Sequence, residues 1–198
     1  MRPVDGRVLL LAFVGFLLSF GGLVGVRAAD KSNGGGASAA MSEAPEPSAE
    51  IQRLASYAGV FEGSGTLSME GKSFPIKIRH EWRSVADGAG MEVHETADCE
   101  ATGHRDAANL FGMDESGKLH LFTVGNDAET HDHAGTWSDP THFRLRYEGT
   151  FQGKPMIEEI PATLEGPDQY SFEAITTLDG KEFAKLAVTM RRAQTAGR

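Results

Sequence analysis

Hydrophobic and polar positions alternate along most of the chain after residue 59. Between residues 142 and 151, one set of alternate positions is apolar and the other is mostly polar or charged. The apolar set is Phe143, Leu145, Tyr147 and Phe151. Successive side chains of a β-strand point to opposite faces of a sheet, so this pattern predicts a half-buried strand. Residues 74–82 and 170–178 show the same alternation and predict two more strands.

Short polar segments that contain glycine lie between the alternating runs. They are residues 70–72, 87–90, 114–117, 152–154, 166–168 and 179–181. Such segments are typical of tight turns, and together with the runs they predict about ten short antiparallel strands. A sheet of this kind protects its edges by packing on a second sheet or by closing on itself. Because the strands follow one another as a meander, we expect an all-β fold, an antiparallel up-and-down barrel of about ten strands.

One segment has helical instead of alternating spacing. Ile51, Leu54 and Tyr57 recur three residues apart, and Ser48 stands before them as a candidate N-cap. We therefore expect one short N-terminal helix ahead of the first strand, and a β-barrel domain that spans residues 49–198.

The first 28 residues have the features of a secretory signal peptide. Arg2 and Arg7 precede an uncharged apolar run over residues 8–26, and the chain up to Ala28 suits signal peptidase. We expect cleavage there and export to the periplasm or the extracellular space. The alternative is an uncleaved anchor, because the apolar run is long enough to span a bilayer. Residues 29–48 are rich in Gly, Ala, Ser and Pro, and we expect them to form a flexible linker.

The chain is acidic, with a formal net charge of −9. Removal of the signal peptide takes away three arginines and one aspartate, which changes this charge to −11. An acidic domain is repelled by nucleic acids and by anionic membrane surfaces, so we expect neither as a partner after cleavage. Cys99 is the single cysteine. An internal disulfide is therefore excluded, and we expect Cys99 to be a buried small apolar side chain.

Several short glycine-based motifs resemble those of known barrel families. Residues 54–67 resemble the opening of calycin-type barrels, in which a Gly-x-aromatic sequence, here Gly59 and Phe61, enters the first strand. Further landmarks are Phe111-Gly112-Met113-Asp114, Gly117-Lys118-Leu119, Gly135-Thr136-Trp137 and Arg191. With them, residues 50–192 are similar to the bacterial domain of unknown function 1579 family. This resemblance implies a lipocalin-like barrel and brings no established activity or catalytic residue.

The first strand also resembles that of nitrobindin-like haem barrels. Their Gly-x-Trp-x-Gly-x-Gly pattern is similar to Gly59, Phe61, Gly63 and Gly65, with phenylalanine in the place of tryptophan. In that family, a histidine from a strand near the C-terminus holds the iron. No histidine follows His142 in this chain. The resemblance therefore does not carry over a haem site, and the sequence assigns no cofactor.

Polar residues on inward faces are the first candidates for a site. By alternation His80 shares an inward face with Trp82, and Glu95 is inward on the following strand. Buried polar groups need partners, so we expect His80 and Glu95 either to pair with each other or to contact a ligand. Of the adjacent residues Glu158 and Glu159, alternation places one toward the solvent and one toward the interior or the barrel mouth.

His131 and His133 form a His-x-His pair on a predicted strand whose same face carries Trp137. A strand places both imidazoles on one side, about 6.5 to 7 Å apart at Cα, which suits zinc if a neighbour supplies a third ligand. The candidates for that ligand are His80, Glu95 and His120. The alternative is a polar strand mouth without metal, and whether a metal binds stays open.

These observations leave three hypotheses for function. The first is a barrel that binds a small, partly apolar molecule through His80, Trp82, Glu95, His131, His133 and Trp137. The second is a metal-assisted hydrolase or isomerase that uses the His-x-His pair. The third is a filled barrel that acts as an interaction module. Nucleophile-elbow, phosphate-loop and dinucleotide motifs are absent from the sequence. The first hypothesis, a small-molecule ligand, is the leading one, mainly by analogy with the expected fold.

Overall fold

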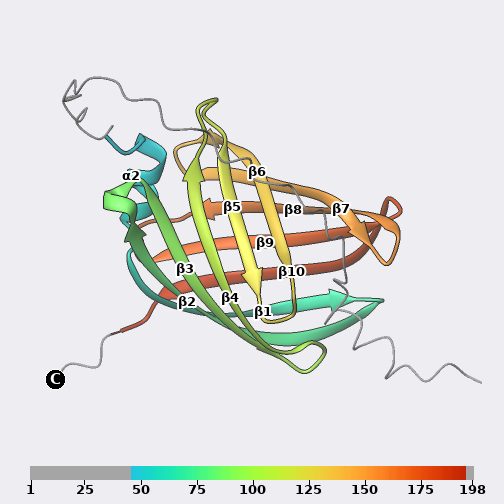
Figure 1. Ribbon diagram of the computed structural model, residues 1–198. Coiled ribbons are helices and arrows are strands. Elements are labelled where there is room, and N and C mark those ends of the chain that lie inside the picture. Colours follow the sequence, from blue (N-terminus) through green and yellow to red (C-terminus); the bar gives the residue numbers. More distant parts are fainter. Residues whose placement is uncertain (1–45, 195–198) are drawn as a thin grey trace, which may run out of the picture.

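The structure is a computed structural model that describes residues 46–194. Ten antiparallel strands close into one barrel, preceded by one short helix, α2 (Ala49–Ala55) (Figure 1). The strands are β1 (Gly59–Met69), β2 (Lys72–Val85), β3 (Gly90–Cys99), β4 (Gly103–Met113), β5 (Leu119–Gly125), β6 (Thr130–Asp139), β7 (His142–Phe151), β8 (Lys154–Leu164), β9 (Gln169–Leu178) and β10 (Lys181–Arg192), with a 3-10 turn, η2 (Ala86–Gly88), between β2 and β3. The predicted fold is confirmed. The predicted signal peptide and residues 29–45 of the predicted linker lie outside the described residues.

Each strand pairs with its neighbours in the sequence, and β1 closes the barrel by pairing with β10. The alternation that predicts the strands is also the pattern of burial. In β7, Phe143 and Leu145 are buried, whereas His142 and Arg144 are exposed. The predicted inward faces therefore form the core.

Because the strands alternate in direction, successive turns lie at opposite ends of the barrel. One end, termed the helix end, holds α2, the start of β1, the end of β10 and the turns before β3, β5, β7 and β9. The other, termed the far end, holds the turns before β2, β4, β6, β8 and β10. Figure 1 shows α2 beside η2, where β2 ends and β3 begins.

The helix α2 forms where the sequence predicts it. Ser48 Oγ accepts a hydrogen bond from the backbone N–H of Ile51 at 3.2 Å, which satisfies one free donor of the first turn. Ile51 and Leu54 are fully buried on the face that packs on the barrel. A helix of two turns is marginal alone, so this burial holds it in place. No helix of the described residues has both the length and the apolar character needed to cross a membrane.

Aromatic rings fill the barrel at the helix end. The centroids of Tyr57, Phe61 and Tyr170 lie 5.1 to 5.8 Å apart. Trp82 stacks on Phe111 at 5.4 Å, and its indole N–H donates to Tyr170 Oη at 3.0 Å. These five residues, termed the aromatic plug, close this end of the lumen.

Arg192 ties the last strand to the helix end. Its guanidinium pairs with Asp168 at 2.8 Å, donates to the carbonyl of Ala58 at 2.8 Å, and lies 4.6 Å from the centre of the Phe61 ring. Arg191, the arginine of the sequence motif, is exposed. The period of two gives Arg192 the inward parity of β10 and turns Arg191 outward.

Glycines let β1 approach β10 closely. A Cβ on Gly65 would lie 2.1 Å from the carbonyl oxygen of Ala187, and a Cβ on Gly63 would lie 2.6 Å from that of Thr189. No other residue fits these positions without a shift of the backbone. The glycine pattern at the start of the barrel thus has a structural reason that is independent of any ligand.

Candidate functional site

The lumen changes in character from the helix end to the far end. Many inward positions of the far half are held by residues with little or no side chain. They are Gly65, Ala97, Ala107, Gly125, Gly149, Ala174 and Ala184. A barrel of eight strands is just filled by ordinary side chains, and ten strands enclose a wider interior. Neighbouring side chains take up space beside several of them: Val188 lies beside Gly65, Asp127 beside Gly125 and Tyr147 beside Gly149.

Apolar side chains on one wall of the far half are only partly buried. Leu67 of β1, Phe172 of β9 and Leu186 of β10 pack against the core but keep part of their surface accessible. These three strands lie across the closed barrel from β6, β4 and β5. An inward side chain of a closed barrel is accessible only from the lumen, so solvent reaches the lumen of the far half.

A chain of polar contacts, termed the polar chain, runs along the lumen from the aromatic plug. Tyr170 Oη lies 2.6 Å from His80 Nδ1. His80 Nε2 lies 2.9 Å from Glu95 Oε2, the residue directly opposite on β3. Glu95 Oε1 in turn accepts a hydrogen bond from Arg105 Nε at 2.9 Å. His80 and Glu95 therefore pair with each other, which is one of the two arrangements that alternation predicts.

Arg105 continues the polar chain to the turn between β5 and β6. Its guanidinium forms ion pairs with Asp127 and Glu129. Glu129 Oε1 lies 2.8 Å from His131 Nδ1 at the start of β6. Burial by itself lowers the pKa of Arg105, but the neighbouring carboxylates, Glu129 first, raise it above its usual range. Arg105 is a fixed positive charge among carboxylates.

The polar chain ends in three residues, His131, His133 and Glu158, termed the His–Glu cluster. Glu158 Oε2 lies 3.0 Å from His133 Nε2 and 3.5 Å from His131 Nδ1. The ring of His131 stacks on Tyr147, with centroids 3.9 Å apart and 15° between the planes. The side chain of His133 is 2% exposed, whereas those of His131 and Glu158 are 16% and 17% exposed. The cluster therefore lies where the packed core meets the accessible lumen.

The polar chain keeps Glu95 ionised. Burial by itself raises the pKa of Glu95, but the hydrogen bonds and charges of His80 and Arg105 outweigh burial and lower the pKa to about 2. Loss of either partner would leave a charge in the lumen without full compensation.

The same balance acts in the His–Glu cluster. Burial raises the pKa of Glu158, but His131 and His133 outweigh it and lower the pKa to about 2. Burial lowers the pKa of His131, but the nearby carboxylates of Glu129 and Glu158 raise it to about 9. At neutral pH a positive charge is therefore held between two carboxylates.

Three buried ring nitrogens have no hydrogen bond of good geometry among the described residues. They are Nδ1 of His131, Nδ1 of His133 and Nε1 of Trp137. For His131 the carboxylate of Glu129 is close but poorly aligned. A buried polar atom left unpaired costs about 1–3 kcal/mol, and such atoms in a folded protein indicate a water, an ion or a ligand. Two of the three belong to the His–Glu cluster.

The structure separates the six predicted site residues into two groups. His80, Glu95, His131 and His133 all belong to the polar chain. Trp82 belongs to the aromatic plug, and Trp137 packs toward the helix end, with its ring 4.8 Å from that of Phe143 and 4.9 Å from the guanidinium of Arg53. The two tryptophans are thus packed between other side chains.

The third donor beside the His-x-His pair is Glu158, and this corrects the prediction that named His80, Glu95 and His120. His80 and Glu95 pair with each other, and His120 lies on the outer face, where it contacts Asp114 and Asp132. Alternation gives the direction of each side chain, but it does not give the curvature that brings side chains of non-adjacent strands together. Glu158 comes from β8, and β7 lies between β8 and β6.

Alternation correctly predicts that Glu158 and Glu159 point to opposite faces of the sheet. Glu159 faces outward and forms ion pairs with Arg144 and Arg146, whereas Glu158 faces the lumen. Arg105 is not among the site residues predicted from the sequence, although its parity on β4 is that of the buried residue Ala107. A charged residue at an inward position was the signal that would have found it.

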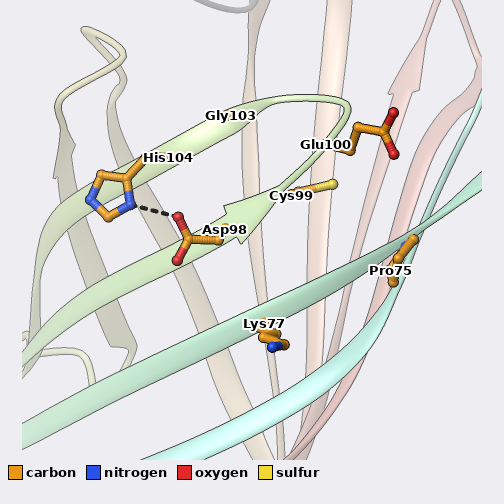
Figure 2. A pocket seen from close by; sticks show the side chains of 7 residues that line it. All are labelled: Pro75, Lys77, Asp98, Cys99, Glu100, Gly103 and His104. Atoms are coloured by element: carbon orange, nitrogen blue, oxygen red, sulfur yellow. Dashed lines mark hydrogen bonds and ion pairs between the residues drawn. The ribbon is translucent and has the colours of Figure 1, made fainter.

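Two hollows lie on the outside and the rim of the barrel. One, of about 480 Å³, opens at the far end beside the turn between β3 and β4 and is lined by Pro75, Lys77, Asp98, Cys99, Glu100, Gly103 and His104 (Figure 2). Two of its polar side chains, Asp98 and His104, pair with each other at 2.9 Å, and Cys99 is buried as predicted. The other, of about 740 Å³, lies over the outer face of β10, β1, β2 and β3. Neither contains a residue of the polar chain.

Comparisons with known proteins show the fold of this chain and not its family. No family model and no curated protein matches the sequence. Among solved structures, the barrel is similar to Rv2717c from M. tuberculosis, with a TM-score of 0.60 and 15% identity over 75% of this chain and 100% of that one. It is also similar to the S-type phycobiliprotein lyase CPES from Guillardia theta, with a TM-score of 0.53 and 11% identity over 75% and 99% of the two chains. The chain is a lipocalin-like barrel.

Proposed function

We propose that this chain is an exported protein whose barrel binds one small, partly apolar molecule in the far half of the lumen. The observation that carries the proposal is that accessible apolar groups and polar groups face the same lumen. Leu67, Phe172 and Leu186 are partly accessible, and Phe172 stacks on His80 of the polar chain, with centroids 5.8 Å apart. Ligand sites typically combine an apolar lining with a few fixed polar groups.

The polar groups of the site are suited to orient such a molecule. Arg105 and Glu95 hold each other in place at 2.9 Å, so neither has to reorganise when a ligand arrives. His133 Nδ1 is buried without a partner among the described residues and is available for a hydrogen bond. The similar barrel from Guillardia theta is named as a lyase of phycobiliproteins. A shared fold is a weak guide to function, so the proposal rests on the lumen of this chain.

The remaining parts of the proposal concern the N-terminus and the family. Cleavage after Ala28, a linker over residues 29–48 and a barrel domain over residues 49–198 follow from the sequence pattern. Membership of the domain of unknown function 1579 family rests on the short glycine motifs.

Sequencing the N-terminus of the protein recovered outside the cytoplasm tests export. We expect Ala29 as the first residue, and an intact Met1 would contradict cleavage.

Binding is tested with N-phenyl-naphthylamine, a neutral apolar dye that fluoresces strongly in apolar sites and has one N–H donor. We expect saturable binding by the full-length protein. Ala174→Phe places a ring on the inward face of β9 and should weaken dye affinity by about tenfold or more, which corresponds to ~1.4 kcal/mol.

The matched control is Thr177→Phe, which adds the same ring to the outward face of the same strand. We expect this variant to bind the dye as the unaltered protein does. Equal affinities of all three proteins would show that the dye does not enter the lumen. Native mass spectrometry of protein purified from the exporting host would then reveal whether any molecule is retained.

A further inference from the structure

The His–Glu cluster joins donor atoms from two strands that are not neighbours. β6 supplies His131 and His133, β8 supplies Glu158, and β7 lies between the two strands. One ring nitrogen of each histidine and one carboxylate oxygen all lie within 4.8 Å of one another. The three donors converge because the sheet curves around the lumen between β6 and β8.

The separations of these atoms fit a shared metal ion. Two ligands bound at about 2.0–2.1 Å in a tetrahedron lie roughly 3.3 Å apart. Glu158 Oε2 lies 3.0 Å from His133 Nε2 and 3.5 Å from His131 Nδ1, so the two observed distances lie on either side of the tetrahedral value. Small side-chain shifts would bring all three atoms to a cation.

The charge of the polar chain also favours a cation. Its carboxylates are Glu95, Asp127, Glu129 and Glu158, and its one arginine is Arg105. A partly buried group of carboxylates needs positive charge nearby, which Arg105, the histidines of the polar chain or a bound cation can supply. An independent observation points to the same place: His131 Nδ1, which lies 3.5 Å from Glu158 Oε2, is buried without a hydrogen bond of good geometry among the described residues.

We propose that His131, His133 and Glu158 bind one divalent metal ion of the zinc class. Two imidazoles and one carboxylate are the protein ligands of zinc sites that keep a further position open. Nitrogen donors favour such an ion over Mg²⁺ or Ca²⁺, which prefer oxygen. Water or the carboxylate of Glu129, 2.8 Å from His131 Nδ1, fills the fourth position. Tyr147 is a positioning residue, because its ring stacks on that of His131.

Calorimetric titration of the metal-free, full-length protein with zinc chloride tests the site. We expect one zinc ion per chain. Glu158→Gln and His131→Gln each remove a ligand, so each should weaken the affinity more than about 100-fold, beyond the effect of losing a residue that only supports a ligand. Circular dichroism verifies that the variants keep the barrel. Absence of zinc binding by the unaltered protein, or unchanged affinity in both variants, overturns the proposal.

The matched control is Glu159→Gln. Glu159 is the next residue of β8, but it faces outward, where it pairs with Arg144 and Arg146. We expect this variant to bind zinc as the unaltered protein does. His120→Ala tests the exposed group of His120, Asp114 and Asp132. Zinc binding that is lost in His120→Ala and kept in Glu158→Gln would place the ion on the outer face and overturn the proposal.

Cobalt supplies a readout that does not depend on how well a variant folds. Co²⁺ absorbs visible light much more strongly in a four-coordinate site than in a six-coordinate one. We expect the strong spectrum in the unaltered protein, and we expect zinc to abolish it. A weak spectrum that zinc leaves unchanged contradicts the site.

The metal site and the proposed function can fail separately. Dye binding is measured on the same zinc-free preparation that is used for calorimetry. Dye binding without zinc binding removes the metal site and leaves the ligand-binding lumen. Zinc binding without dye binding supports the metal site and contradicts the proposed ligand-binding lumen.

Discussion

The helix end and the far end of the barrel are built from the same ten strands, but their inward side chains differ. At the helix end, Phe61, Met91, Leu119 and Met190 are 0% exposed, and the aromatic plug leaves no polar group without a partner in its centre. At the far end, small residues, partly accessible apolar side chains and the polar chain share the lumen. Backbone pairing closes the barrel in both halves. The inward positions are therefore free to serve stability in one half and polar chemistry in the other.

The largest effect that would test this division is a change from phenylalanine to alanine in each half. Phe61→Ala empties a fully buried ring site in the aromatic plug and should lower the free energy of unfolding by about 3–5 kcal/mol. Phe172→Ala, in the accessible half, should cost about 1–3 kcal/mol, because part of that ring is already in contact with solvent. Urea unfolding measures both. Equal losses would mean that the two halves are packed alike.

The next effect concerns pH and the charge of Glu95. The pKa of Glu95 falls from 4.5 to about 2 on folding, so its charge stabilises the fold above pH 4.5, and this contribution is lost as the pH falls through 2. The whole contribution is at most about 3 kcal/mol. Unfolding in urea at a series of pH values should show a shallower acid loss for Glu95→Gln than for the unaltered protein. Glu62→Gln, at an exposed position, should keep the original slope.

A smaller effect compares arginines inside and outside the barrel. Arg105→Met leaves three carboxylates of the polar chain without their shared partner and should cost about 1–3 kcal/mol. Arg83→Met removes an ion pair with Glu92 on the outer face, where the side chain of Arg83 is 67% exposed. This change should lower the free energy of unfolding by less than about 1 kcal/mol. Thermal unfolding of the two variants side by side measures the difference. A larger loss for Arg83→Met would contradict the structural role of the polar chain.

The smallest effect sharpens the comparison by removing one hydroxyl from each end. Tyr57→Phe deletes a hydrogen bond of 2.7 Å to the carbonyl of Gly166 and should cost about 1 kcal/mol. Tyr147 contacts the His–Glu cluster through its ring, and no hydrogen bond to the described residues engages its hydroxyl. Tyr147→Phe should therefore leave the unfolding midpoint unchanged. A loss at Tyr147 as large as that at Tyr57 would indicate a bound water or ligand at that hydroxyl.

Part of the candidate site follows from the sequence, because it depends on neighbouring strands. His80 and Glu95 stand opposite each other across a tight turn, and alternation places both in the lumen. The predicted face shared by His131, His133 and Trp137 is present in β6 for the same reason. Arg105 could also have been predicted from the sequence, because it is a charged residue at an inward position of its strand.

The amino-acid sequence by itself determined the strands, the turns, the short helix and the inward faces, because the period of two and the turn residues act over a few neighbouring positions. Only the tertiary structure decided which inward residues of non-adjacent strands meet. Glu158 reaches His131 and His133 across β7, and Tyr170 of β9 reaches His80 of β2 across the lumen. Those contacts depend on the curvature and width of the closed barrel. Curvature is a property of all ten strands together, and no local pattern encodes it.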